Sequence, residues 1–166
     1  MRKLYLVLLV CALPQLGWGQ LMFRTTLSGW NEVPSRDTPA WGIGHATLDL
    51  DTKWFTFDYT FENLLAPQTA AHIHVAPAGV NGAVLYPLPN GSPSGLNIML
   101  TDTDIDQLRS GMWYVNVHSQ LYPGGEIRGQ FVPVPEASTY ALGAAAILGV
   151  ALMRRYRQLR SARAVG

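Results

Sequence analysis

Residues 54–61 read Trp-Phe-Thr-Phe-Asp-Tyr-Thr-Phe, and this segment sets the fold class of the chain. Every second residue is an aromatic ring, so four rings lie on one side of an extended strand: Phe55, Phe57, Tyr59 and Phe61. A strand with this alternation has one face in an apolar core and the other face outside it. We therefore expect a β-strand whose four rings belong to the core.

The same period-two pattern continues on both sides of this strand, through residues 20–134. Proline and glycine clusters interrupt it at roughly eight- to twelve-residue spacing, which is typical of antiparallel sandwiches and barrels. We predict an all-β fold, an antiparallel Greek-key-like β-sandwich with one short helix at 102–109. The expected strands are residues 21–27, 46–50, 55–61, 69–75, 83–88, 96–100, 112–118 and 126–132.

The short helix is expected to begin after Thr101, whose hydroxyl is a good N-cap, with Asp102 and Asp104 in the first turn. The alternating aspartates of this segment suggest a calcium loop as an alternative. Such a loop needs a turn glycine and a closing glutamate, and Gln107 and Trp113 stand at those positions. The helix is therefore the preferred interpretation.

Charge divides the chain into three parts. The 166 residues include 12 Lys or Arg, 11 Asp or Glu and a single Cys. Residues 20–134 hold five basic and ten acidic residues, whereas both ends are basic. An acidic body does not attract nucleic acid, and one Cys excludes a disulfide framework or a Cys-based zinc site. We expect one compact domain between two basic ends.

Residues 1–19 have the features of a secretory signal peptide. The basic pair Arg2 and Lys3 precedes ten uncharged residues, and Gly17-Trp18-Gly19 supplies small residues at the cleavage site. An apolar segment this short does not span a bilayer as a helix. We predict a signal helix that is removed on export, and we take residues 20–132 as the domain.

The other end, residues 133–166, predicts a membrane segment. Its 17 uncharged residues at 137–153 make a helix of about 26 Å, at the short end of what crosses a bilayer. Arg154 and Arg155 follow, with three more arginines behind them, and such a cluster stays in the cytoplasm. We predict a C-terminal transmembrane helix with these two arginines as the cytoplasmic stop.

Val134-Pro135-Glu136, the apolar segment and the arginines together resemble the PEP-CTERM sorting signal of Gram-negative bacteria. The resemblance implies that Val134, Pro135 and Glu136 form a sorting motif, which an exosortase-type enzyme recognises and cleaves. The export machinery and that enzyme are then partners, and the C-terminal helix holds an inner-membrane-anchored intermediate. The implied destination is the cell surface or an exopolysaccharide matrix.

Histidines supply the candidate site. Alternation places His72 and His74 on one face of the strand at 69–75, away from the apolar residues beside them. Two imidazoles spaced in this way lean toward a shared ion, and His118 or Glu126 from another strand would be the third ligand. Imidazoles suit zinc or copper, so the candidate metal ligands are His72, His74 and His118. The alternative is a set of surface or loop-anchoring histidines bonded to backbone carbonyls.

A charged pair and four tryptophans are further candidate functional residues. Glu126 and Arg128 share one face of their strand, and we expect a solvated ion pair of small value. Four tryptophans form a platform for sugar rings if they are exposed, although core packing is expected for at least half of them. They are Trp30, Trp41, Trp54 and Trp113.

Several segments that carry a family resemblance follow one another along residues 27–131. They read Leu-Ser-Gly-Trp-Asn-Glu-Val-Pro at 27–34, Ala-Ala-His-Ile-His at 70–74, Gly-Val-Asn-Gly at 79–82, Tyr-Val-Asn-Val-His at 114–118 and Gly-Gly-Glu-Ile-Arg-Gly at 124–129. Together they resemble the chordin-type CHRD domain. The resemblance implies an extracellular all-β domain with no settled enzymatic activity.

These observations predict an exported, non-enzymatic CHRD-domain protein at the cell surface or in the exopolysaccharide matrix of a Gram-negative bacterium. Its domain is expected to act as a binding or structural module, with a matrix polysaccharide or a surface protein as partner. Two alternatives stay open. One is a metal-binding or metal-dependent redox protein that uses the three histidines, and the other is a polysaccharide-binding module.

Overall fold

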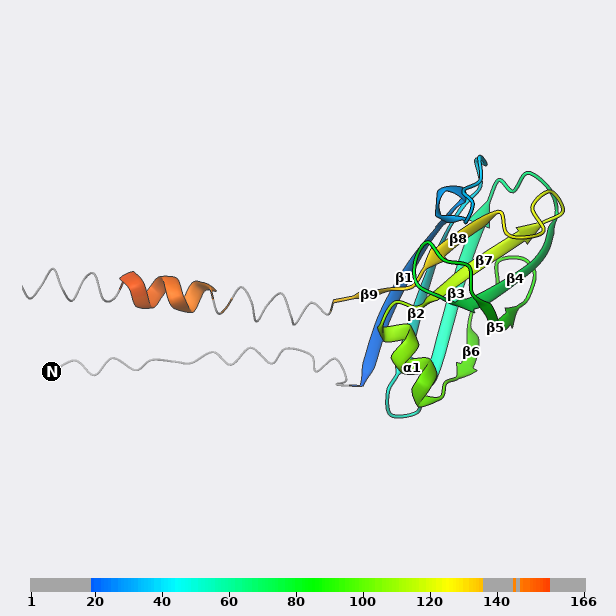
Figure 1. The fold of residues 1–166 in the computed structure, drawn as a ribbon. Helices are drawn as coiled ribbons and strands as arrows, with labels where there is room; N and C mark the ends of the chain where they lie inside the picture. Colours follow the sequence, from blue (N-terminus) through cyan, green and yellow to red (C-terminus); the bar gives the residue numbers. More distant parts are fainter. Residues whose placement is uncertain (1–18, 136–144, 146, 156–166) are drawn as a thin grey trace, which may run out of the picture.

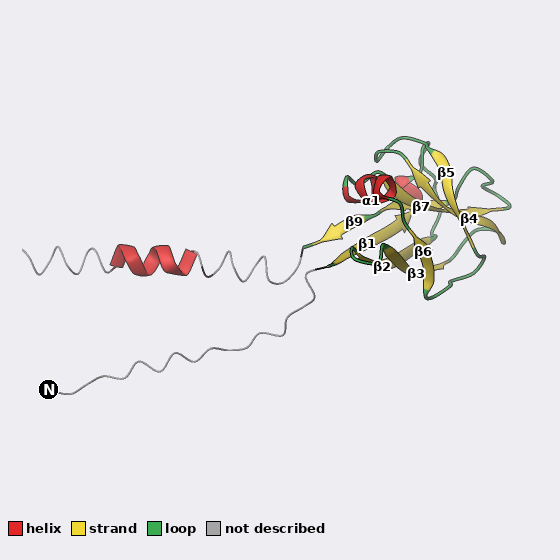
Figure 2. Cartoon of the chain, turned by 90° about the horizontal axis from the view of Figure 1, so that it is seen from below, coloured by secondary structure: helices red, strands yellow, loops and turns green. Residues whose placement is uncertain are grey.

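The computed structural model of the chain describes residues 19–135, 145 and 147–155. Residues 19–135 are mostly β-structure, with one α-helix and one 3-10 turn (Figure 1, Figure 2). The elements are β1 (Gln20–Ser28), η1 (Gly29–Asn31), β2 (Trp41–Asp49), β3 (Trp54–Glu62), β4 (Gln68–Val75), β5 (Ala83–Leu88), β6 (Leu96–Met99), α1 (Asp102–Arg109), β7 (Trp113–Ser119), β8 (Ile127–Gln130) and β9 (Val132–Val134).

The described strands join into one antiparallel sheet. Its order is β5-β4-β7-β8-β1-β2-β3-β6, with β9 alongside β1. The sheet curls on itself, so that β3 faces β7 across the core (Figure 2), and the rings of Phe55 and Trp113 lie 5.8 Å apart between centroids. The predicted all-β, antiparallel and sandwich-like fold is confirmed in this form, as a single curled sheet.

The aromatic rings of β3 form the centre of the core, as the alternation predicts. Phe55, Phe57 and Tyr59 are at most 2% exposed. The Phe57 and Tyr59 rings are stacked with centroids 5.2 Å apart, and Phe131 meets Phe57 edge-on at 5.0 Å. Phe61, at the end of the strand, is partly buried against this cluster. Burial of such rings is the main favourable contribution to folding of a sheet domain.

β2 begins at Trp41, earlier than the predicted start at residue 46. The added residues reverse the usual pattern, because Gly42 and Gly44 are buried while Trp41 and Ile43 face outward. The reason is steric: a Cβ on Gly44 would lie 2.8 Å from the ring of Phe57, and glycine leaves room for that ring. Because the inward-facing residues here are glycines and not apolar side chains, the alternation pattern does not mark this part of the strand.

The strand predicted at 126–132 is two strands, β8 and β9. They are separated by Phe131, whose side chain is buried in the core and whose backbone N–H donates to the Trp113 carbonyl at 2.9 Å. β9 then pairs with β1, with Val134 opposite Met22. The first residue of the expected sorting motif is therefore the last residue of a strand.

The predicted helix is present as α1, with the predicted N-cap. The Thr101 hydroxyl accepts from the Asp104 N–H at 3.2 Å, and the Asp104 carboxylate accepts from the Thr101 N–H at 2.9 Å. This reciprocal capping box satisfies two backbone donors that the first turn leaves unpaired. Asp102 pairs with Lys53 at 2.8 Å, and Leu108 is fully buried against the core. Asp102 and Asp104 therefore lie in the first turn of α1, as the helix interpretation predicts.

The expected signal helix at 1–19 lies outside the described residues, apart from Gly19. Glu136 of the expected sorting motif also lies outside them. The described part of the C-terminal segment is helical at 147–155, which includes Arg154 and Arg155. In the portion of the chain that the structure describes, every helix is too short or too polar to cross a bilayer.

Candidate metal centre

The candidate site lies on the side of β4, β7 and β8 that faces away from the apolar core. Strand alternation predicts polar side chains there, but the face is covered, and all seven residues of β7 are buried. Three loops hydrogen-bond to its side chains, at 29–40, 76–82 and 120–125. His74 and His118 are consequently 8% exposed, so they are not surface histidines, but both bond to loop carbonyls, as the alternative to a metal site predicts.

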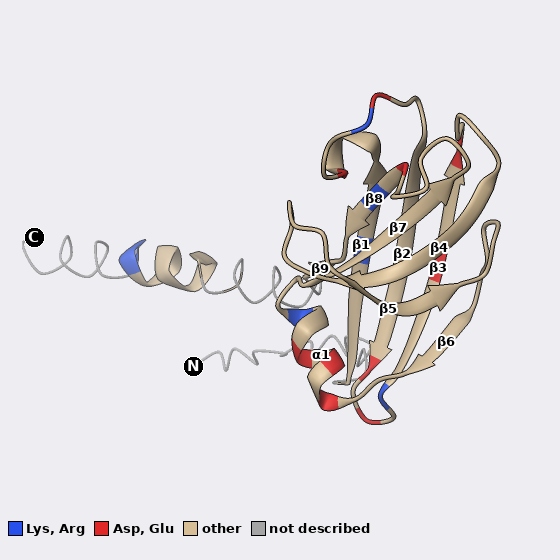
Figure 3. Ribbon diagram, turned by 45° about the vertical axis from the view of Figure 1, so that its right-hand side comes forward, with Lys and Arg blue, Asp and Glu red and all other residues tan. Residues whose placement is uncertain are grey.

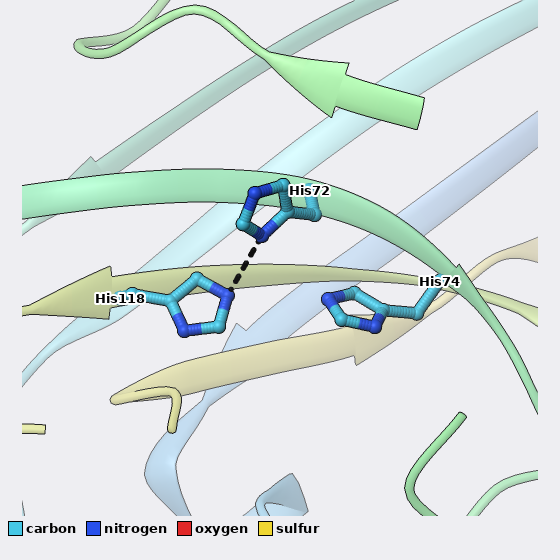
Figure 4. A group of neighbouring side chains, drawn as sticks. All are labelled: His72, His74 and His118. Atoms are coloured by element: carbon cyan, nitrogen blue, oxygen red, sulfur yellow. Dashed lines mark hydrogen bonds between the residues drawn. The ribbon is translucent and has the colours of Figure 1, made fainter. Parts of the chain in front are cut away.

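Three histidines meet on this covered face (Figure 4). In the antiparallel pairing of β4 with β7, His72 lies opposite Asn116 and His118 lies opposite Ala70, which makes the two histidines diagonal neighbours. One ring nitrogen from each of His72, His74 and His118 lies within 4.8 Å of the other two. The closest pair, His72 Nδ1 and His118 Nε2, is 3.0 Å apart. The structure thus brings together the three residues that the sequence singled out.

Backbone carbonyls orient two of the rings. His74 Nδ1 lies 3.0 Å from the Gly82 carbonyl, and His118 Nδ1 lies 2.9 Å from the Pro123 carbonyl. A carbonyl only accepts, so each Nδ1 is the protonated nitrogen and each neutral ring carries its lone pair on Nε2, which in His118 accepts from His72 Nδ1. This second hydrogen bond from the outer nitrogen is the usual arrangement of a metal-binding histidine.

The protonation state also favours ligation. Burial lowers the pKa of His74 and the pKa of His118 below the ordinary value for histidine, and their neighbouring imidazoles act in the same direction. Both rings are therefore neutral at pH 7, as metal ligands must be. His74 Nε2 is buried and has no hydrogen-bond partner within the described residues. A buried lone pair without a donor is costly unless something binds it.

A stack of planar groups supports His74 from behind. The Tyr114 ring lies parallel to the His74 ring, with centroids 4.9 Å apart and an angle of 10°. The Arg128 guanidinium lies 4.3 Å from the centroid of the same Tyr114 ring. The Tyr114 hydroxyl accepts from the Gly82 N–H at 3.0 Å, which ties the loop at 76–82 to this stack. These contacts fix the orientation of the His74 ring in the absence of a metal ion.

Glu126, the alternative third ligand, is engaged elsewhere. Its Oε1 accepts from the Thr38 hydroxyl at 2.7 Å and from the Leu65 N–H at 2.8 Å. Arg128 donates to Asn81 Oδ1 at 2.9 Å and to a backbone carbonyl. Glu126 is 0% exposed and Arg128 is 2% exposed, so the expectation of a solvated pair between them is wrong. Glu126 and Arg128 therefore hydrogen-bond to different loops and not to each other.

The remaining aromatic and histidine candidates lie apart from the cluster. Trp113 is buried in the core, whereas Trp30 is 81%, Trp41 45% and Trp54 42% exposed. Core packing was expected for at least half of these tryptophans, and that expectation is wrong. His45 is exposed on β2, away from the other three histidines.

Glu32 is a buried acid that the sequence did not single out. It is 5% exposed, and burial raises its pKa to about 7, although Arg128 and Arg36 oppose the shift. Its Oε1 is buried without a hydrogen-bond partner in the described part of the chain. Glu32 lies in a loop, where no periodic pattern predicts burial, and it is buried because the loop packs against the sheet.

Comparison with known proteins gives one match. A family model described as the CHRD domain matches residues 23–131. No curated protein and no solved structure matches the chain. The matched region contains the three histidines, the stack behind His74 and all of the loops that cover them.

Proposed function

The chain belongs to the CHRD domain family, and we propose that its β-domain is an exported binding module that holds a zinc or copper ion between His72, His74 and His118. The observation that carries the proposal is the convergence of three ring nitrogens within 4.8 Å on a covered face. Carbonyl bonds from two outer nitrogens and a buried, unpartnered Nε2 on His74 support it.

The spacing of the nitrogens fits a tetrahedral ion with little adjustment. Zinc–nitrogen bonds of 2.0–2.1 Å place two tetrahedral ligands about 3.3 Å apart. His72 Nδ1 and His118 Nε2 are already 3.0 Å apart, and a small side-chain rotation brings His74 Nε2 closer. To bind an ion through Nδ1, His72 would carry its proton on Nε2 instead, a change of tautomer and not of charge.

The ligand type narrows the choice of ion. Three imidazoles without a thiolate or a carboxylate favour zinc or copper over calcium or magnesium, which prefer oxygen. Three protein ligands leave a fourth coordination position for water or another molecule. His72 is the most accessible of the three residues.

Metal content tests the proposal. The full chain, stripped with a chelator and then loaded separately with zinc and with copper, should retain about one ion per chain. His72→Ala with His74→Ala should abolish retention, because one imidazole cannot replace three. His45→Ala is the matched control and should retain the ion, since His45 is exposed outside the cluster. Metal-free wild type, or a His45→Ala chain that loses the ion together with the double variant, would reject the site.

Export is the second element of the proposed function. The basic and apolar start at 1–19 and the order of motif, apolar segment and arginines in 133–166 support it. We propose that an exosortase-type enzyme processes the chain at Val134, Pro135 and Glu136, and that the domain reaches the cell surface or the exopolysaccharide matrix. The membrane then holds the intermediate through the C-terminal segment.

Cell fractionation in a Gram-negative host with an exosortase tests this route. The wild-type chain should appear outside the inner membrane with both ends shortened, as seen by mass spectrometry. Pro135→Ala should accumulate in the membrane fraction with its C-terminal end intact, whereas Pro133→Ala should be processed normally. An intact wild-type chain in the cytosol would contradict export, and normal processing of Pro135→Ala would contradict the motif.

A further inference from the structure

A pocket of about 570 Å³ lies on the outer face beside β1 and β8, bordered by η1 and the loop at 76–82. Its volume is in the range of small-molecule sites. The three histidines do not line it, so it is distinct from the candidate metal centre. The residues that define its chemistry are Arg24, Trp30, Glu32, Arg128 and Gln130.

The pocket is locally basic on an acidic domain. Arg24 from β1 and Arg128 from β8 both line it, and Figure 3 shows basic positions on these two strands. Residues 20–134 hold ten acids and only five bases, so two arginines at one pocket are a local concentration. The one acid in the lining is Glu32, and its raised pKa of about 7 leaves it partly uncharged at neutral pH. The pocket therefore favours an anion.

Arg128 is fixed in position for such a role. Its guanidinium donates to Asn81 Oδ1 at 2.9 Å and to the Val80 carbonyl at 3.1 Å, and it lies over the Tyr114 ring. Both hydrogen-bond acceptors are uncharged, and the described residues form no salt bridge to Arg128. A buried cation without an ionic partner is compensated when a carboxylate binds nearby. Arg24 is exposed and adds a second charge from the rim.

Trp30 adds an aromatic surface to the same pocket. It is 81% exposed, the most exposed tryptophan of the described residues, although a free indole face is unfavourable in water. An indole face packs against the C–H groups of a flat ring and keeps its N–H for a hydrogen bond. Gln130 donates to the carbonyls of Ala76 and Gly111, which holds its amide in place at the pocket.

We propose that this pocket binds a carboxylate-bearing sugar unit of an acidic polysaccharide. Trp30 packs on the sugar ring, and Arg24 and Arg128 face the carboxylate. A sugar fits better than an acidic peptide, because a peptide carboxylate sits on a flexible stem and brings no flat apolar face to Trp30. The histidines do not line the pocket, so none of these contacts requires a metal ion.

Affinity gel electrophoresis of the full chain tests the proposal. The gels contain polygalacturonate as the acidic glycan, dextran as the neutral glucan or poly-glutamate as the acidic peptide. We expect retardation by polygalacturonate alone. Trp30→Ala and Arg24→Gln should each weaken the apparent affinity about tenfold. Trp54→Ala and Arg109→Gln, which change exposed residues outside the pocket, should leave it unchanged.

Each other outcome counts against the proposal. Equal retardation by dextran would remove the role of the carboxylate, and equal retardation by poly-glutamate would remove the role of the sugar ring. The arginines near the C-terminal end are the same in every variant, so retardation that survives both Trp30→Ala and Arg24→Gln would place binding outside the pocket. Unchanged mobility in polygalacturonate would reject the site.

Discussion

Trp113→Ala should lower the free energy of unfolding by about 3–5 kcal/mol, the usual range for truncation of a fully buried aromatic residue. The Trp113 side chain is 0% exposed. Its ring contacts Phe55 at 5.8 Å and Tyr86 at 5.6 Å between centroids, so it fills the space between the two sides of the curled sheet. Its removal leaves a cavity lined by apolar groups, which the surrounding rings close only in part.

Chemical denaturation followed by far-ultraviolet circular dichroism measures this loss without relying on tryptophan fluorescence. Trp54→Ala is the matched control, since Trp54 is 42% exposed at the start of β3, and it should cost about 1 kcal/mol or less. Similar losses for the two variants would show that the sheet does not close around Trp113 as described.

Glu32→Gln should raise the free energy of unfolding at pH 8 by about 1–3 kcal/mol and leave it nearly unchanged at pH 5. Burial raises the pKa of Glu32 from 4.5 to about 7 in the folded chain. The folded state therefore binds more protons than the unfolded state between these values. The stability contributed by the neutral acid is present below pH 4.5 and is lost as pH rises through 7, when a carboxylate must be buried. Glutamine cannot ionise and avoids this loss.

The difference between the wild-type and Glu32→Gln denaturation curves, measured from pH 5 to pH 8, isolates this effect. The comparison matters because His74 and His118 act in the opposite direction: their lowered pKa values make the folded state more stable as pH rises toward 6.5. Glu62→Gln, at an exposed position on β3, should leave the pH profile unchanged. Parallel profiles for wild type and Glu32→Gln would show that Glu32 is charged throughout this range.

Local patterns predicted much of the sheet. The alternating rings of β3 and the N-cap at Thr101 depend on neighbours in sequence, and both are present as expected. The starts and ends of β2 and β8 were less accurate, because Gly44 and Phe131 respond to rings that are distant in sequence. Strand pairing is likewise non-local, and sequence period alone does not specify it.

The candidate site shows the same division. The His-x-His spacing was enough to place His72 and His74 on one face, and His118 was preferred to Glu126 for the third position by ligand type rather than by any spacing. The pairing of β4 with β7 brings His118 to the cluster, and a loop donor at Leu65 occupies Glu126. The burial of His74, Glu32 and Arg128 was not foreseen, because it comes from loops that fold over a face whose residues look like a solvated surface.

The double covering of β7 has a consequence for motion. β7 lies between β4 and β8 in the sheet, with the apolar core on one side and the loop-covered polar face on the other. Its amides are therefore released to solvent only when the domain opens as a whole, rather than by fraying at an edge. β7 carries His118, one of the three clustered histidines, and Tyr114, which stacks on His74, so the backbone beneath these two residues is held until the domain unfolds globally.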